Sequence, residues 1–373
     1  MLRETDVFVI GGGPAGLAAA ISARAKGFRV ALADGSQPPI DKSCGEGLMP
    51  DTLAALGDLG VSVSDSEGYS VRGVRFLGRA NEVVATFPLG QGIGLRRVVL
   101  HEKLVERASA CGVSLLWKTP VAGICDEGVR LASGVVRAKW IIGADGIGSR
   151  VRKWAGLDAP MRPDSRFAVR RHYRMSPWSD FMEVYWGDRA QAYVTPVAAD
   201  EVCVVLISRE RGLDFGAVDE EFPKLAARVR LAELTGAERG AISMTQKLKR
   251  VYRRQVALIG DASGSVDAIT GEGLRLGFRQ AVALAEALAA GNLSSYQIAH
   301  RRFARRPMLM GHLMLRLDGR PKLREFTLRA MASDARVFPR LLAAHVGEKS
   351  EAHLAATGAL LGWRFVATSL AIS

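Results

Sequence analysis

The 373-residue sequence predicts an α/β protein, in which a mixed β-sheet domain is inserted into a Rossmann-like nucleotide-binding domain and a helical C-terminal region follows. Three observations predict this fold class. A glycine-rich turn separates a short apolar run from a helix-prone segment near the N-terminus, strand-like alternation fills residues 165–208, and the chain becomes helical and basic after residue 300. A chain of this length exceeds one simple core, so we expect two closely packed domains.

The first predicted elements are a strand over residues 6–10, the turn GGGPAG at residues 11–16, and a helix. In this GxGxxG arrangement Gly11 permits the tight turn, Gly13 lets the backbone approach a pyrophosphate, and Gly16 lets the helix pack closely on the strand. A second strand over residues 28–33 ends at Asp34, which has the spacing of a ribose-binding carboxylate. The pattern predicts a dinucleotide site and does not by itself distinguish NAD from FAD.

Further segments complete the predicted Rossmann-like domain. Residues 113–117 and 139–145 have the pattern of strands, and the second of these runs into a Gly-Ala-Asp-Gly turn and a helix. Residues 256–261 form another apolar strand, and the small residues of GDASGSVDAITGEGL (260–274) precede an alanine-rich helix over 273–290. So many small residues leave the backbone N–H groups bare, which raises the question of what they contact.

Together these segments resemble the three fingerprints of the flavoprotein aromatic hydroxylase superfamily, the p-hydroxybenzoate hydroxylase-like fold that also holds geranylgeranyl reductases and flavin-dependent halogenases. The resemblance spans residues 5–290 and implies that the Rossmann-like domain binds FAD. It implies that Asp261 binds the ribityl chain, and that the following loop and helix N-terminus stabilise negative charge on the reduced flavin. The FAD-binding residues it implies are Gly11, Gly13, Pro14, Ala15, Gly16, Asp34, Lys42, Cys44, Gly45, Arg97, Val121, Asp145, Gly260, Asp261, Gly271, Glu272, Gly273 and Leu274.

Residues 41–50, DKSCGEGLMP, match the loop that lies over the flavin in this superfamily. The Cys-Gly pair is similar to the geranylgeranyl reductase-like branch, which makes Cys44 a candidate catalytic residue if the protein is a reductase. Lys42 could supply the cation that thiolate activation needs. A small packed thiol is the alternative interpretation of Cys44.

Residues 165–208 contain four strand-like segments, RFAVRRHYRM, FMEVYW, AQAYVTP and EVCVVLIS. The resemblance assigns them to the sheet that covers the flavin and lines the substrate pocket. Arg170, Trp186 and Tyr193 are the candidate substrate residues, and His172 is the candidate acid–base residue because histidine titrates near neutrality. Period-two alternation tells which residues share a face but not which face meets the ligand, so a purely structural role is an equal alternative for each.

Composition and motif content limit which binding partners and which kinds of catalytic or metal site are expected. The 51 Lys and Arg residues against 38 Asp and Glu give a formal charge of +13, which favours anionic partners. No basic stripe interleaved with aromatic residues occurs, so no nucleic-acid partner is expected. The four cysteines lie far apart and the histidines lack metal-site spacing, which predicts no metal site and fits a reducing cytoplasm. Neither GxSxG, SxxK nor the halogenase pattern WxWxIP is present.

The C-terminal region is basic from residue 300 to 340 and holds a run of Met and Leu from Met308 to Leu315. Core packing, a lipophilic substrate tunnel and a membrane-facing surface are all compatible with this run. Residues 354–372 are apolar over the length of a membrane span, but Arg364 interrupts them, which predicts an amphipathic helix. We therefore expect a cytoplasmic protein able to associate peripherally with the inner face of an anionic membrane, with its oligomeric state left open.

The resemblance implies an NAD(P)H-dependent monooxygenase that hydroxylates a hydrophobic aromatic substrate, such as a phenolic lipid or polyketide of secondary metabolism, through C4a-hydroperoxyflavin. The alternative is a geranylgeranyl reductase-like flavoprotein that reduces isoprenoid double bonds. The expected FAD-binding domain has three parts, residues 1–70, 96–160 and 251–295. The expected substrate domain has two, residues 71–95 and 161–250, and residues 296–373 form the helical region.

Overall fold

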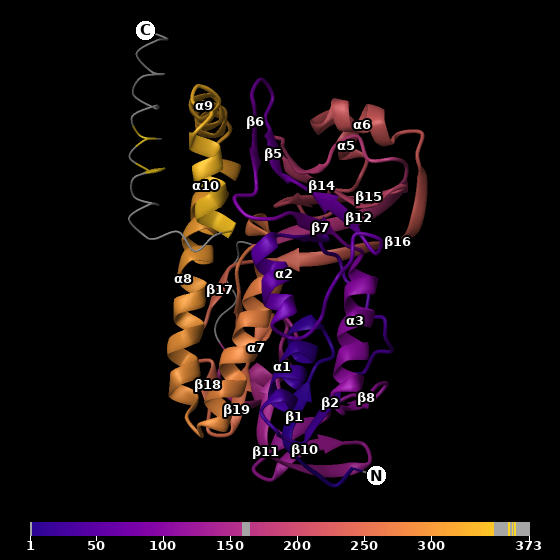
Figure 1. The fold of residues 1–373 in the computed structure, drawn as a ribbon, viewed down its shortest axis with the longest axis vertical. Helices are drawn as coiled ribbons and strands as arrows, with labels where there is room; N and C mark the ends of the chain where they lie inside the picture. The colour runs from indigo at the N-terminus through magenta and orange to yellow at the C-terminus, as the bar shows by residue number, and fades with distance from the viewer. Residues whose placement is uncertain (1, 159–164, 347–356, 359, 361, 363–373) are drawn as a thin grey trace.

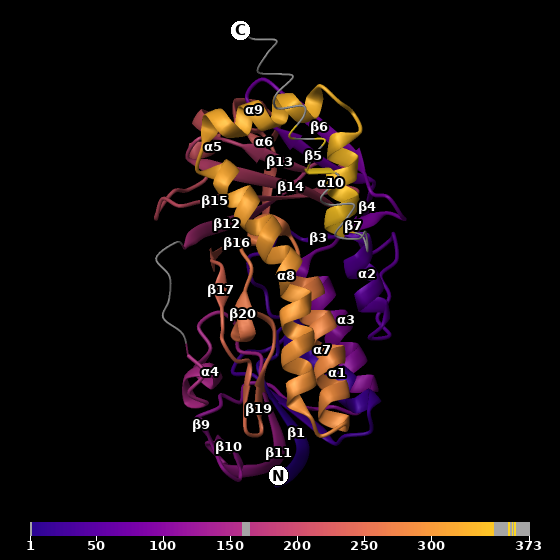
Figure 2. The same cartoon turned by 90° about the vertical axis from the view of Figure 1, so that its left-hand side faces the viewer.

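The computed structural model describes residues 2–158, 165–346, 357, 358, 360 and 362. Two β-sheets lie at opposite ends of an elongated molecule, and a long helix, α8 (Leu293–Asp318), runs along one side and joins them (Figures 1 and 2). The predicted fold class is confirmed: a Rossmann-like α/β domain carries a second, mixed sheet and a helical C-terminal region.

The first sheet has eight strands, with the order β18-β19-β11-β1-β2-β8 and a β9–β10 hairpin that pairs with β11. Its central strands β2, β1, β11 and β19 run parallel. The runs VFVI, VALA and WIIG in these strands are apolar, as expected for a parallel sheet that is covered on both faces. The strands are β1 (Glu4–Ile10), β2 (Val30–Ala33), β8 (Ser114–Leu116), β9 (Gly123–Cys125), β10 (Gly128–Leu131), β11 (Gly134–Gly143), β18 (Tyr252–Arg253) and β19 (Val256–Leu258).

Three helices cover one face of this sheet: α1 (Pro14–Ala25), α3 (Arg97–Ala110) and α7 (Gly273–Ala289). Helix α1 packs between α3 and α7 (Figure 1). Its buried alanines at positions 18, 19 and 20 have short side chains, so the neighbouring helices can approach closely. Short elements link the sheet to its surroundings: α2 (Pro50–Gly57), α4 (Arg150–Trp154), the 3₁₀ turns Gly260–Ser263 and Ala268–Thr270, and a small pair, β17 (Gln246–Lys247) with β20 (Gly264–Ser265).

The second sheet has seven strands in the order β16-β12-β15-β14-β13-β5-β6. All of its pairs are antiparallel except β13 with β5, so the sheet is mixed as predicted. The strands are β5 (Gly73–Leu77), β6 (Glu82–Thr86), β12 (Arg166–Arg174), β13 (Phe181–Trp186), β14 (Ala190–Ala198), β15 (Glu201–Ser208) and β16 (Glu233–Ser243). Two short helices, α5 (Ala217–Glu221) and α6 (Pro223–Val229), cover its outer face, and a three-stranded sheet of β3 (Gly47–Leu48), β7 (Gly92–Gly94) and β4 (Tyr69–Val71) lies at the junction with the first domain.

Three helices follow α7 in the described part of the chain up to residue 346: α8 (Leu293–Asp318), α9 (Pro321–Ala332) and α10 (Val337–Val346). Helix α8 packs on α7 at one end and reaches α9 at the other, while α9 and α10 pack on β6 (Figure 2). Most of the predicted amphipathic segment at residues 354–372 lies outside the described residues. Within the described part of the chain, no helix is both long and apolar enough to cross a membrane.

Candidate functional site

The glycine-rich turn joins β1 to α1 with its backbone tightly packed on one side and open on the other. A Cβ atom on Gly11, whose φ is 112°, would lie 2.4 Å from the carbonyl oxygen of Ala144, and a Cβ on Gly16 would lie 1.9 Å from the oxygen of Gly11. A Cβ on Gly13, the N-cap of α1, would meet no atom within 4 Å. The free N–H groups at the start of α1 therefore face open space, as an anion-binding helix terminus requires.

Two side chains hold this turn in place. The Asp34 carboxylate accepts hydrogen bonds from the backbone N–H groups of Gly12 and Ser36, both at 2.7 Å. The buried His101 bonds the carbonyl oxygen of Gly12 through Nε2 at 2.8 Å, and burial lowers the pKa of this histidine, which keeps the ring neutral and able to donate. No sequence pattern predicts this role of His101, because its partner lies 89 residues away in the chain.

The glycine-rich turn at the start of α1 forms one cradle that could hold part of a ligand. A second cradle lies where β19 ends. Asp261 is half exposed and has Lys42 Nζ 3.8 Å from its carboxylate. The following loop turns through Gly271, whose φ is 67°, and leads directly into α7 at Gly273. The N-terminus of α7 thus faces the same space as the N-terminus of α1.

One cavity of about 1100 Å³ connects the two cradles and continues beneath the seven-stranded sheet to α8, α9 and α10. A pocket this size exceeds the range of about 300–1,000 Å³ typical of one small ligand. The predicted FAD-binding residues that line it are Gly11, Gly13, Pro14, Ala15, Asp34, Lys42, Cys44, Gly45, Arg97, Val121, Asp145, Gly260, Asp261, Gly271, Gly273 and Leu274.

Two predicted cofactor residues lie away from the cavity wall. Gly16 is covered by Gly11, and its role is close helix packing. The buried Glu272 pairs with Arg275 and lies 3.7 Å from Nδ1 of His345 on α10. Asp145 lines the cavity through its turn, while its carboxylate bonds the backbone N–H groups of residues 150 and 151 at the start of α4.

The far end of the cavity is apolar. Alternate residues of β5, β13, β14 and β15 point into it from the sheet, and α8, α9 and α10 close it from the other side. Its apolar lining comprises Val74, Phe76, Met182, Val184, Val205, Ile207, Ile269, Met310, Leu313, Met314, Leu317, Leu323, Met331, Phe338, Leu341 and Leu342. Part of the Met- and Leu-rich run of α8 therefore lines a lipophilic chamber.

The candidate substrate residues separate in the structure. Tyr193 lines the cavity and donates its hydroxyl to Gln191 Oε1 at 2.9 Å, and burial raises the pKa of this tyrosine well above its usual value, so the hydroxyl stays protonated. Gln191 also accepts a hydrogen bond from Arg166 at 3.0 Å, and Arg166 forms a fully buried ion pair with Asp267 in the loop before α7. Trp186 is buried against Phe76 behind the cavity wall.

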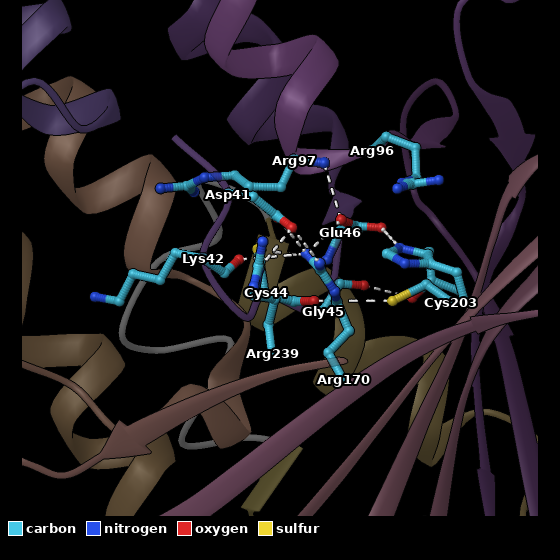
Figure 3. A network of polar contacts seen from close by, with 12 residues as sticks. Asp41, Lys42, Cys44, Gly45, Glu46, Arg96, Arg97, Arg170, Cys203 and Arg239 are labelled. Atoms are coloured by element: carbon cyan, nitrogen blue, oxygen red, sulfur yellow. Dashed lines mark hydrogen bonds and ion pairs between the residues drawn. The ribbon is translucent and has the colours of Figure 1, made fainter. Parts of the chain in front are cut away.

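Arg170 and His172 are both about 1% exposed and lie outside the cavity lining. Figure 3 shows Arg170 beside the loop at residues 41–47. Both bind Glu46: Arg170 Nη1 lies 3.0 Å from Oε1, and His172 Nε2 lies 2.6 Å from Oε2. Arg170 also holds both carboxylate oxygens of Asp41, at 2.9 and 2.8 Å. Sequence reasoning missed Glu46, although it lies inside the CGEG motif, because its partners are 124 and 126 residues further along the chain.

The ligand atoms of Glu46, His172 and Cys203 lie within 4.8 Å of one another, which is the spacing of a metal site. Two features oppose a cation there. The Arg170 guanidinium already contacts the carboxylate, and burial raises the pKa of the Cys203 thiol well above its ordinary value, which favours the protonated form. The cluster is better explained as a hydrogen-bond network.

Comparison with known proteins identifies the family to which the chain belongs. A family described as "FAD binding domain" matches residues 4–293. The chain belongs to this family. It is an FAD-dependent oxidoreductase, as the resemblance implies, and FAD is its cofactor.

The residues present fit FAD. The space above Gly13 is open, and Arg97 lines the cavity with an Nε atom that is buried and has no hydrogen-bond partner among the described residues. A buried donor without a hydrogen-bond partner costs about 1–3 kcal/mol of stability. A bound group that accepts a hydrogen bond from this Nε atom would remove that cost.

The curated relatives include isoprenoid reductases. The digeranylgeranylglycerophospholipid reductase of Methanosarcina acetivorans is 28% identical over 72% of this chain and 71% of its own, and the menaquinone reductase of Mycobacterium tuberculosis is 26% identical over 78% of each. A geranylgeranyl bacteriochlorophyll reductase-like protein of Thermoplasma acidophilum superimposes with a TM-score of 0.78 at 19% identity, covering 96% of this chain and all of its own. A flavoprotein/dehydrogenase of Cytophaga hutchinsonii gives 0.83 at 18% identity, covering 99% and 100%, so both solved structures share the fold.

Proposed function

We propose that this protein is an FAD-dependent reductase that adds hydrogen across double bonds of an isoprenoid chain carried by a lipid or quinone. The observation that carries the proposal is one continuous cavity that joins the two nucleotide cradles to a long apolar chamber. A flexible isoprenoid chain fits such a chamber because it is apolar along its whole length. The relatives named as isoprenoid lipid and menaquinone reductases support the same chemistry.

The two cradles would divide the cofactor between them. Gly13 and the N-terminus of α1 would hold the pyrophosphate, and Asp34 retains acceptor capacity for an adenosine ribose. Asp261 would bind the ribityl chain, and the N-terminus of α7 at Gly271–Gly273 would face the flavin and stabilise its reduced, anionic form. Once bound and reduced by NADH or NADPH, FAD would supply a hydride to the substrate and return to its oxidised form.

The chain itself must supply a proton, since hydride addition to one alkene carbon requires a proton at the other. Groups that carry a transferable proton line the cavity, among them the Cys44 thiol in the CGEG loop and the Tyr193 hydroxyl on β14. We assign the proton to Cys44, because its loop lies between the FAD cradles and the apolar chamber, and keep Tyr193 as the substitution to compare. The apolar walls would exclude water from the reduced cofactor.

The sequence predicts an aromatic hydroxylase first, and the curated relatives favour the reductase alternative instead. The deciding experiment supplies NADH or NADPH to the purified protein with geranylgeranyl lipids and menaquinone, with and without oxygen, and weighs the products. A gain of two hydrogens per double bond without oxygen supports the reductase. A product heavier by one oxygen atom, formed only in air, refutes it and restores the hydroxylase.

We also propose that the protein collects its substrate from an anionic membrane surface. Leu313 and Arg316 of α8 and Arg320 before α9 line the cavity and are exposed on the outside, so the apolar chamber opens beside two arginines. Neither arginine has an ion-pair partner among the described residues. Cationic residues around an apolar opening suit a lipid bilayer with anionic head groups.

A further inference from the structure

Glu46 has an unusual backbone conformation for a residue with a side chain. Its φ is 57°, in the left-handed region, and both flanking residues are glycines. A side chain in this region costs about 1 kcal/mol and persists only where the surroundings enforce it. Glu46 is nonetheless 2% exposed, so the carboxylate is held inside the protein.

Three donors from two separate parts of the fold fix this carboxylate. The backbone N–H of Arg97, the first residue of α3, donates to Oε1 at 2.9 Å, and Arg170 Nη1 donates to the same oxygen at 3.0 Å. His172 bonds the other oxygen, Oε2, at 2.6 Å. Glu46 therefore ties the start of α3, in the FAD-binding domain, to β12 of the seven-stranded sheet (Figure 3).

The neighbouring loop residues are held by the same sheet. Thr195 on β14 donates to the carbonyl oxygen of Gly45 at 2.8 Å, and the Cys203 thiol on β15 donates to the carbonyl oxygen of Cys44 at 3.8 Å. The backbone N–H of Glu46 itself points at Cys44 Sγ, 3.5 Å away. The position of the Cys44 thiol at the cavity wall thus depends on how Glu46 is anchored.

We propose that Glu46 is a positioning residue: through Arg97, Arg170 and His172 it fixes the loop that carries Cys44 between the FAD-binding part and the apolar part of the cavity. His172 acts through Glu46 and not on the substrate. The consequence for turnover rests on the proposed reductase function, whereas the anchoring of the loop does not.

The test compares Glu46→Asn with Glu46→Gln and with a matched control, Glu201→Gln. Asparagine tolerates the left-handed backbone but is one methylene too short to reach the three donors, while glutamine keeps the length and loses the charge. Glu201 is a partly buried carboxylate that pairs with Arg96, next to the start of α3, at 2.6 Å, and it has no hydrogen bond or ion pair with the loop among the described residues.

The first measurement is the rate at which a maleimide labels Cys44, located by peptide mass spectrometry and normalised to the partly exposed Cys111 and Cys125. We expect Glu46→Asn to raise the relative labelling of Cys44 at least fivefold, and Glu46→Gln to raise it less. Glu201→Gln should leave it unchanged. No substrate is needed, so this result is independent of the proposed reaction.

The second measurement is turnover at saturating FAD with the isoprenoid substrate. We expect kcat to fall at least tenfold in Glu46→Asn with KM nearly unchanged, and Glu46→Gln to recover part of the loss. Unchanged Cys44 labelling in Glu46→Asn overturns the proposal. It is equally overturned if all the cysteines become reactive together with a large fall in Tm, since Glu46 would then support the whole fold. A wild type that labels as expected but reduces no isoprenoid refutes the proposed function alone.

Discussion

Replacing Gly13 by alanine separates cofactor binding from folding. Its φ and ψ of −71° and 174° are open to alanine, and the new methyl group would meet no protein atom within 4 Å. Loss of unfolded-chain entropy stabilises the variant by about 0.4–1 kcal/mol, and the poorer N-cap costs a similar amount, so the apoprotein Tm should change by less than about 3 °C. The methyl group occupies space that the pyrophosphate needs, and such overpacking costs about 1–3 kcal/mol. FAD should therefore bind roughly 5- to 140-fold more weakly.

The assay is a titration of apoprotein with FAD, followed by flavin fluorescence, beside thermal unfolding of the apoprotein. Gly57→Ala is the matched control, because Gly57 also has room for a methyl group but lies on the surface at the end of α2. Gly16→Ala is the opposite control: its Cβ would lie 1.9 Å from the Gly11 oxygen, so it should fail to fold. Wild-type FAD affinity in Gly13→Ala would refute the placement of the pyrophosphate at this turn.

Three further predictions follow from named groups. Asp261→Ala should weaken FAD binding by roughly 2- to 12-fold, the worth of one hydrogen bond, and full flavin loading at wild-type affinity would contradict the assignment. Burial lowers the pKa of His300 to about 4 from 6.5, so stability should fall as pH drops from 6.5 towards 4, because only the unfolded state binds a proton there. Urea unfolding at pH 7 and pH 5 should show about 2 kcal/mol more loss in the wild type than in His300→Gln, and equal losses would disprove the burial argument. Changing Arg316 and Arg320 together to glutamine should weaken flotation with anionic vesicles by roughly 30-fold at low salt, from about 1 kcal/mol per arginine; unchanged flotation would exclude this surface.

The parts of the fold that depend on local pattern were predictable from the sequence. Strands β12 to β15 and helix α7 agree with the predicted ranges to within a few residues, because alternation and small-residue turns are encoded along the chain. Strand β16 was not predicted, since ELTGAERGAIS is polar and mostly exposed and forms a strand only by pairing with β12. A helical region after residue 300 was predicted, but not that one helix, α8, continues through the buried Pro307, since proline by itself disfavours a helix interior.

In the candidate site, too, some residues could be predicted from local sequence and others depend on distant contacts. The residues around Gly13 were predicted from the spacing of the GxGxxG motif, and those around Asp261 from the resemblance to the flavoprotein superfamily; both sets lie in short continuous segments of the sequence. The roles of Glu46 and His172 depend on partners more than a hundred residues apart, and period two could place His172 on a face without telling what that face meets. The sequence pattern therefore made His172 a candidate acid–base residue, whereas in the structure its ring bonds Glu46 of the loop at residues 41–47 and lies outside the cavity lining.

The junction between the two sheets explains why the loop at residues 41–47 has so many distant partners. A Cβ on Gly94 of β7 would lie 1.8 Å from the carbonyl oxygen of Pro196 on β14, so the two domains meet backbone to backbone there. Contacts this close leave no room for a side chain at Gly94, which constrains the distance from the FAD cradles to the apolar chamber. Hydride transfer needs reacting atoms about 3–3.5 Å apart, so rate is more sensitive to this distance than binding is. Substitutions at the junction should therefore lower kcat, whereas those in either chamber should weaken the affinity for that chamber's own ligand.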